Sequence, residues 1–135
     1  MKKVLVFGTF DGFHEGHRDF LRQARRHGDF LRVVVARDIN VFKIKGRSSR
    51  YSEGERMMTI KASRLANEVV LGGLNDRYEV VRDYQPDIIC LGYDQKQSLG
   101  ELRRKLDETG LGRTILTRLQ SYKPQLFKSS LLREE

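Results

Sequence analysis

Ten residues near the start of the chain, GTFDGFHEGH at positions 8–17, bring together groups that could do chemistry. They include three glycines, two histidines, an aspartate and a glutamate, and they follow the apolar run at residues 4–7. Small and polar residues directly after a strand are typical of three kinds of site. These are a metal centre, a phosphate-binding turn and a purely structural turn.

A phosphate-binding turn is the alternative that these residues favour. Gly8 allows a sharp turn and lets a ligand approach the backbone closely. Free N–H groups in the turn and at the start of the next helix attract an anion. His14 and His17 are three residues apart, so both face one side if the helix begins there, and Gly16 leaves room for a bulky group. Two imidazoles beside a helix N-terminus suit a chain of phosphates.

The spacing fits a metal or dinucleotide site less well. A zinc-protease helix carries histidines four residues apart, and no further Cys or His cluster supplies ligands to His14 and His17. Dinucleotide-binding turns need G-x-G-x-x-G, and Gly8, Gly12 and Gly16 are spaced differently. A structural turn accounts for the glycines but not for two histidines in register. We therefore predict a phosphate-binding turn and no protein-held metal.

Strands and helices alternate along the chain. Apolar runs predict strands at residues 4–7, 31–36, 68–71, 87–91 and 113–119. Helices are predicted at residues 17–27, 52–66, 76–84 and 98–108, and a last one starts near Ser129. Ser52 and Glu55 have the spacing of a capping box. The remaining segment, residues 37–50, is predicted to be a polar, basic loop.

This alternation predicts an α/β fold. Strands joined by helices form right-handed crossovers, which give a parallel sheet covered on both faces. We expect a single doubly wound, Rossmann-like domain over residues 1–135, with a parallel five-stranded sheet and helices on both faces. Ligands of such sheets bind beyond the carboxyl ends of the strands. The segments to examine are residues 8–17, 37–47, 92–97 and 120–130.

Charge and composition indicate the partners and the compartment. The net charge of +8, from 26 basic and 18 acidic residues, favours an anionic partner, either nucleic acid or a phosphorylated small molecule. No apolar run is long enough for a bilayer or a signal peptide. The single cysteine, Cys90, is expected to be a buried strand thiol. We expect a cytoplasmic protein without membrane contact. The densest basic cluster is Lys43, Lys45, Arg47 and Arg50.

The stretch at residues 8–17 resembles the signature of the cytidylyltransferase-like nucleotidyltransferases, G-[TS]-F-D-x-x-H-x-G-H, at every fixed position. Two later stretches agree in motif order. GYDQ at residues 92–95 falls where the family contacts the nucleotide base. FKSSLLR at residues 127–133 is similar to the late I-S-[ST]-[ST] signature, whose hydroxyls reach the triphosphate.

The resemblance implies a reaction and a set of residues. An acceptor attacks the α-phosphorus of a nucleoside triphosphate and releases pyrophosphate, without a covalent enzyme intermediate. Magnesium arrives with the triphosphate, since no carboxylate cage is visible. The catalytic residues implied are His14, His17 and Lys45. Those implied for the nucleotide are Gly8, Thr9, Phe10, Asp11, Gly16, Gly92, Tyr93, Asp94, Gln95, Ser129 and Ser130.

Four residues retain alternatives. Asp11 either orients the turn by bonding nearby backbone amides, which is favoured, or touches the ligand. Arg56, on the helix predicted at residues 52–66, either reaches a phosphate of the acceptor or nucleotide or faces solvent. Lys43 competes with Lys45 for the reacting phosphates, and a solvated loop charge is the alternative for each.

Three stretches favour a flavin acceptor. VVVARD at residues 33–38, PDIICLGYDQ at 86–95 and YKPQLFKSS at 122–130 resemble small stand-alone archaeal-type FAD synthetases. This implies ATP and flavin mononucleotide (FMN) as partners, and the family's frequent dimers leave a homodimer open. The alternative enzyme uses CTP with glycerol 3-phosphate or another small phosphorylated alcohol or sugar, but the arginine and glycine of that branch's late motif are absent.

A basic nucleic-acid-binding module is the alternative of another class. We expect no nucleic-acid partner, because the aromatic residues are not interleaved with the basic cluster.

Overall fold

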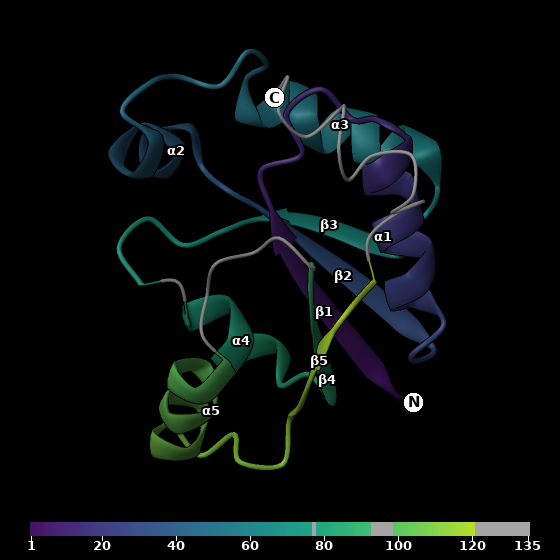
Figure 1. Ribbon diagram of the computed structural model, residues 1–135, viewed down its shortest axis with the longest axis vertical. Helices are drawn as coiled ribbons and strands as arrows, with labels where there is room; N and C mark the ends of the chain where they lie inside the picture. The colour runs from purple at the N-terminus through teal and green to yellow at the C-terminus, as the bar shows by residue number, and fades with distance from the viewer. Residues whose placement is uncertain (77, 93–98, 121–135) are drawn as a thin grey trace.

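The computed structural model describes residues 1–76, 78–92 and 99–120 (Figure 1). Strands and helices alternate through these residues, with two helices between the second and third strands. The elements are β1 (Lys3–Gly8), α1 (Glu15–Arg25), β2 (Phe30–Val35), α2 (Asp38–Lys45), α3 (Glu53–Ser63), β3 (Glu68–Leu71), α4 (Glu79–Tyr84), β4 (Ile88–Leu91), α5 (Leu99–Glu108) and β5 (Ile115–Arg118).

The five strands form one parallel sheet in the order β3-β2-β1-β4-β5. β1 is central, and its Val6 pairs with Val33 of β2 on one side and Cys90 of β4 on the other. The chain proceeds outwards from β1 first through β2 and β3, and then on the opposite side through β4 and β5. The carboxyl end of β1 is therefore the topological switch point, where such sheets bind ligands.

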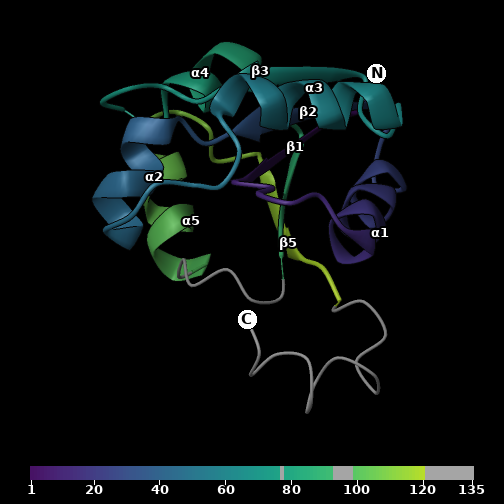
Figure 2. The same cartoon turned by 90° about the horizontal axis from the view of Figure 1, so that it is seen from above.

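The two faces of the sheet are covered by different helices, α1 and α3 on one face and α4 and α5 on the other (Figures 1 and 2). Successive side chains of a strand point to opposite faces. Accordingly, Val4 and Val6 belong to the core cluster with α1 and α3, and Leu5 belongs to the cluster with α4 and α5. The predicted α/β fold, doubly wound with helices on both faces, is confirmed.

The segment at residues 37–50 differs from its predicted loop, because it contains α2. This helix spans Asp38–Lys45 and is capped by Gly46, whose left-handed backbone (φ 72°) suits a glycine. Only Val41 of α2 is buried, and its other large apolar side chains project to solvent. The sequence therefore shows no amphipathic periodicity from which a helix could be predicted. The exposed apolar residues are Ile39, Phe42 and Ile44.

The other predicted elements are confirmed wherever the structure describes them, with ends shifted by a few residues. The capping box of α3 is present: Ser52 Oγ accepts from the Glu55 amide at 3.1 Å, and Glu55 Oε1 accepts from the Ser52 amide at 3.0 Å. The helix predicted near Ser129 lies outside the described residues. Cys90 is buried in β4 as predicted, and burial raises the pKa of its thiol to about 12. No helix within the described ranges has the length and apolar character to span a membrane.

Candidate active site

The turn after β1 delivers His14 to the N-cap of α1. Its Nδ1 accepts from the amides of Gly16 at 3.0 Å and His17 at 3.4 Å, while His17 Nδ1 accepts from the His14 amide at 3.2 Å. This is a capping box in which histidines replace the usual Ser/Thr and Glu/Gln. The two imidazoles stack, with ring centroids 3.8 Å apart. α1 thus starts at Glu15 and not at His17, because His14 itself ends the turn.

The capping box fixes which ring nitrogen is available to a ligand. A neutral imidazole has one acceptor nitrogen and one N–H donor. Since Nδ1 of both His14 and His17 accepts from the backbone, the proton of each neutral ring lies on Nε2. The pair therefore presents two Nε2–H donors at the start of α1, where the Gly16 and His17 amides are already bonded to His14 Nδ1. Donors of this kind bind phosphate oxygens.

Two phenylalanines of the same turn enclose His17. Phe10 meets its ring edge-on at a centroid distance of 5.4 Å, and Phe13 stacks on it at 5.8 Å. Burial, followed by the nearby charge of His14, lowers the pKa of His17 from 6.5 to about 4, although Asp11 acts in the opposite direction. His17 is therefore neutral at pH 7. The family resemblance implied a nucleotide contact for Phe10 and no role for Phe13.

The lowered pKa of His17 predicts an acid dependence of stability. In the unfolded chain this imidazole takes up a proton near pH 6.5, and in the folded chain only near pH 4. Between these values the unfolded state binds more protons, so the free energy of unfolding falls as the pH falls from 6.5 to 4. Urea unfolding of the wild type and His17→Gln at pH 7.5, 5.5 and 4.5 should show a steeper loss for the wild type. An equal loss of unfolding free energy with falling pH in the two proteins would contradict the lowered pKa of His17.

Gly8 and Gly16 make room for side chains of the turn itself. A Cβ on Gly8 would lie 2.6 Å from the Phe10 ring, and one on Gly16 would lie 2.8 Å from Cε1 of His14. We predicted that Gly16 leaves room for a bulky group between the histidines. In the structure, the space at Gly16 is taken by the His14 ring, which folds back to cap α1.

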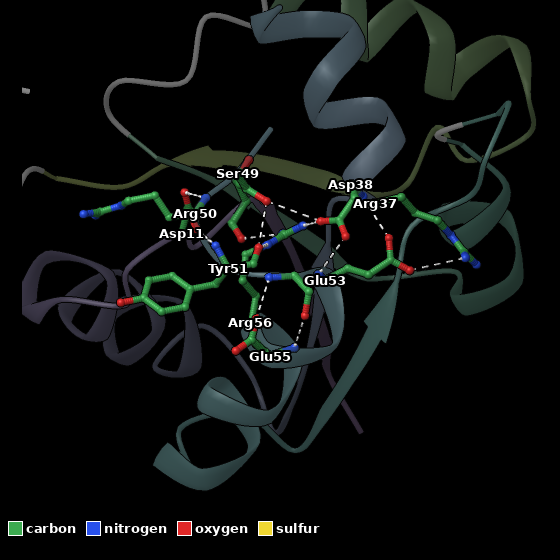
Figure 3. Close-up of polar contacts among 11 residues, drawn as sticks. Asp11, Arg37, Asp38, Ser49, Arg50, Tyr51, Glu53, Glu55 and Arg56 are labelled. Atoms are coloured by element: carbon green, nitrogen blue, oxygen red, sulfur yellow. Dashed lines mark hydrogen bonds and ion pairs between the residues drawn. The ribbon is translucent and has the colours of Figure 1, made fainter. Parts of the chain in front are cut away.

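Asp11 ties the turn to the segment before α3. Its Oδ2 accepts from the Arg50 amide at 2.8 Å and its Oδ1 from the Tyr51 amide at 2.9 Å (Figure 3). Asp11 therefore bonds backbone amides, as the favoured alternative has it. These amides are far from Asp11 in the sequence, whereas the prediction was for amides of neighbouring residues. Burial alone would raise the pKa of this carboxyl, but the two amide hydrogen bonds and the Arg50 and Arg56 charges lower it below its usual value.

Arg56 does not face solvent, so that alternative is wrong. It is 1% exposed, and each of its side-chain nitrogens donates to the protein (Figure 3). Nη1 donates to the Thr9 carbonyl at 2.8 Å, Nη2 to Asp38 Oδ1 at 2.7 Å and Nε to the Tyr51 carbonyl at 3.1 Å. A buried guanidinium at this position was not predicted, because its partners come from three separate segments.

The two candidate lysines lie on α2 and not on a loop. Lys43 and Lys45 are in its last turn, and both are exposed. The first residue of α2, Asp38, is bonded to Arg56, so the same guanidinium contacts both the helix that carries the lysines and the turn that carries the histidines. The structure therefore connects the two sets of candidate phosphate ligands through Arg56.

The remaining candidates lie at the other side of the switch point or beyond the described residues. Gly92 follows β4 directly, and its carbonyl accepts from Arg118 Nη1 of β5 at 2.9 Å. Three or more His, Cys, Asp or Glu side chains arranged to hold a metal ion are not found within residues 1–76, 78–92 and 99–120. The candidates outside the described residues are Tyr93, Asp94, Gln95, Ser129 and Ser130.

A parallel sheet of this order, with a paired-histidine turn at its switch point, places candidate phosphate-binding groups where α/β proteins bind their ligands. Residues 5–135 match the model of the family described as cytidylyltransferase-like, and the chain belongs to this family. The family that the motif at residues 8–17 predicted is confirmed.

The chain is similar to known proteins over most of its length. It is 37% identical over 135 residues to the FAD synthase of Thermoplasma acidophilum, and this match covers 100% of this chain and 94% of the relative. It is 44% identical over 110 residues to the FAD synthase of Methanococcoides burtonii, covering 82% and 76%. A solved structure, the lipopolysaccharide core biosynthesis protein from Thermoplasma volcanium GSS1, is similar with a TM-score of 0.86 at 34% identity, covering 91% of this chain and 99% of that one.

Proposed function

We propose that the protein transfers AMP from ATP to FMN, forming FAD and pyrophosphate. The similarity to archaeal FAD synthases over most of their length supports this substrate pair. The observation that carries the proposal is the His14–His17 capping box at the switch point. It leaves two Nε2–H donors at the positive end of the α1 dipole, which is an environment for a triphosphate.

In this proposal the turn binds the triphosphate, and three further segments supply the other contacts to the nucleotide. The amides of Thr9 and Phe10 and the imidazoles of His14 and His17 donate to the triphosphate. His17 is a neutral donor at pH 7, since its pKa is about 4. Positive charge is supplied instead by Lys45, or by Lys43 two residues before it on α2. For the base, we propose contacts from residues 92–95, and for the triphosphate further contacts from Ser129 and Ser130.

The chemical step is a single displacement at the α-phosphorus of ATP. A phosphate oxygen of FMN forms the new bond to this atom. The bond from the α-phosphorus to the bridging oxygen of the β-phosphate breaks, and pyrophosphate leaves with the electron pair. No protein nucleophile is needed, and the one cysteine is buried with a thiol pKa of about 12. Positioning and charge neutralisation provide the catalysis.

We propose that Mg²⁺ enters with ATP and neutralises charge on its phosphates. The residues near the turn fit a metal carried by the nucleotide better than a protein cage. Asp11 and Asp38 already accept hydrogen bonds from the protein at both carboxylate oxygens. Magnesium commonly keeps its water and phosphate ligands and needs only one or two protein groups. We place the reaction in the cytoplasm, which suits a chain with one buried thiol.

A substrate matrix tests the proposal. ATP and CTP are each offered with FMN, glycerol 3-phosphate, phosphocholine and pantetheine phosphate, and pyrophosphate release is measured in the presence of Mg²⁺. We expect release with ATP and FMN, together with FAD detected by chromatography. Turnover with a non-flavin acceptor only would overturn the assignment of the acceptor.

A filter-binding assay tests the alternative of another class. We expect weak binding of random RNA at 50 and 200 mM salt, because the basic residues do not form an RNA-binding motif. Strong, salt-sensitive RNA binding without pyrophosphate release in the matrix would overturn the assignment as an enzyme.

A further inference from the structure

Phe10, at the centre of the histidine turn, has a backbone conformation that its side chain disfavours. Its φ is 55°, in the left-handed region. The other non-glycine residues with positive φ in the described part of the chain are Arg64 and Gln85, and both cap the end of a helix. Phe10 caps no helix. A strained residue of this kind persists only where its surroundings hold it.

The conformation of Phe10 places its ring within the turn. The ring is 5% exposed, lies under Gly8 and meets His17 edge-on. Relaxation of Phe10 towards negative φ would move this ring and remove one wall of the pocket that buries His17. The backbone of Phe10 therefore controls the position of a histidine seven residues later in the chain.

The residues on both sides of Phe10 are held by one distant segment. Before it, the Thr9 carbonyl accepts from Arg56 Nη1 at 2.8 Å. After it, the Asp11 carboxylate accepts from the amides of Arg50 and Tyr51. Tyr51 closes the ring of contacts, because its carbonyl accepts from Arg56 Nε at 3.1 Å (Figure 3).

Arg56 makes these contacts from the interior. It is 1% exposed, and Asp38 Oδ1 pairs with its Nη2 at 2.7 Å. Asp38 is in turn fixed to the start of α3, where its amide donates to Glu53 Oε1 at 2.8 Å and its Oδ2 accepts from the Glu53 amide at 3.2 Å. All three nitrogens of this guanidinium are engaged in bonds to the protein. We therefore expect its effect on a ligand to pass through Thr9, Asp38 and Tyr51.

We propose that Arg56 and Asp11 are positioning residues, which hold Phe10 in its left-handed conformation and so fix the amides and imidazoles of the turn for the triphosphate. This inference rests on the proposed function, and it gives both residues a role other than ligand contact. The guanidinium fork is required, since Arg56 must meet two carbonyls and a carboxylate at once. A lysine ammonium is a point charge on a flexible stem and cannot reproduce this geometry.

Arg56→Lys tests the proposal against a matched variant, Arg103→Lys. Arg103 also donates to two backbone carbonyls, those of Leu111 and Thr114, but in the connection between α5 and β5. Histidine titration followed by NMR is simple in a chain with three histidines, and His17→Gln assigns the signal of His17. Steady-state kinetics with ATP and FMN provide kcat and the KM for ATP.

In Arg56→Lys we expect His17 to titrate closer to its ordinary value of 6.5 than to about 4, because its aromatic cover relaxes. We expect kcat/KM for ATP to fall by ~10- to 100-fold, as for a small misplacement of binding groups. Arg103→Lys should change neither quantity. If Arg56→Lys does not fold by circular dichroism, Asp11→Glu replaces it, since the longer side chain keeps the negative charge but moves the carboxylate away from the Arg50 and Tyr51 amides, and the same changes are expected.

Loss of activity with an unchanged His17 titration would overturn the proposal, because it would indicate direct contact with the ligand. An unchanged titration together with unchanged kinetics would also overturn it. The titration uses no substrate, so its outcome is separate from the proposed function. If the pKa of His17 shifts in Arg56→Lys while the wild-type protein forms no FAD from FMN and ATP, the positioning role stands and the substrate assignment fails.

Discussion

Replacement of His17 by alanine is expected to lower turnover by at least ~100-fold, the usual effect of removing one donor to a transition state. His17 contributes in two ways. Its Nε2–H is available as a neutral donor, and its Nδ1 accepts from the His14 amide and so helps to hold the partner imidazole. Both are lost in His17→Ala. The core of α1 should survive, because its buried residues are Leu21 and Ala24.

Turnover of ATP and FMN in His17→Ala is measured beside His27→Ala as a control. His27 follows the other end of α1, far from the turn, and donates its amide to the Ala24 carbonyl as a helix end does. The control should retain normal turnover. Circular dichroism should show the same helix content in both variants. Near-normal turnover of His17→Ala would remove His17 from the mechanism.

Gly16→Ala is the second variant with a large expected effect. Its Cβ would lie 2.8 Å from Cε1 and 3.0 Å from Nδ1 of His14, so the imidazole must shift from its position at the N-cap. Loss of a helix cap costs about 1 kcal/mol. Displacement of a phosphate donor by about 1 Å can reduce turnover by ~100-fold. Intrinsic helix propensity alone predicts the opposite sign, a stabilisation of about 0.5–1 kcal/mol.

Gly54→Ala separates these two effects. Gly54 is the second residue of α3, as Gly16 is of α1, and an added Cβ would meet only Ser52 Oγ at 3.9 Å. We expect Gly54→Ala to raise the melting temperature and to leave turnover unchanged, and Gly16→Ala to lower both. Equal behaviour of the two variants would show that the His14 ring does not depend on the space at Gly16.

The pattern of short apolar runs along the sequence was enough to predict the strands of the sheet. Val69 and Val70 form a short apolar run closed by Gly72 and Gly73, and β3 has the predicted bounds, Glu68–Leu71. The alternation along β1 reflects a strand buried on both faces, where Val4 and Leu5 enter different cores. The histidine motif was sufficient to place the candidate site at the switch point.

Contacts between distant segments could not be predicted in this way. Arg56 meets the carbonyl of Thr9, which lies 47 residues earlier, and no local periodicity indicates that contact. α2 was missed because its side chains make little contact with the core. The capping role of His14 did leave a signal, since His14 and His17 have the spacing of a capping box. That signal is easily overlooked because histidine is an unusual residue at both positions.

The central claim, direct transfer of AMP to FMN, is tested most directly with ATP labelled with ³²P at its α-phosphate. The wild-type protein is incubated with FMN and Mg²⁺, and labelled products are separated by chromatography. We predict that the label appears in FAD, with one pyrophosphate released for each FAD formed. Label that stays in ATP with FMN, while CTP labelled at the same position transfers its label to glycerol 3-phosphate, would contradict the claim.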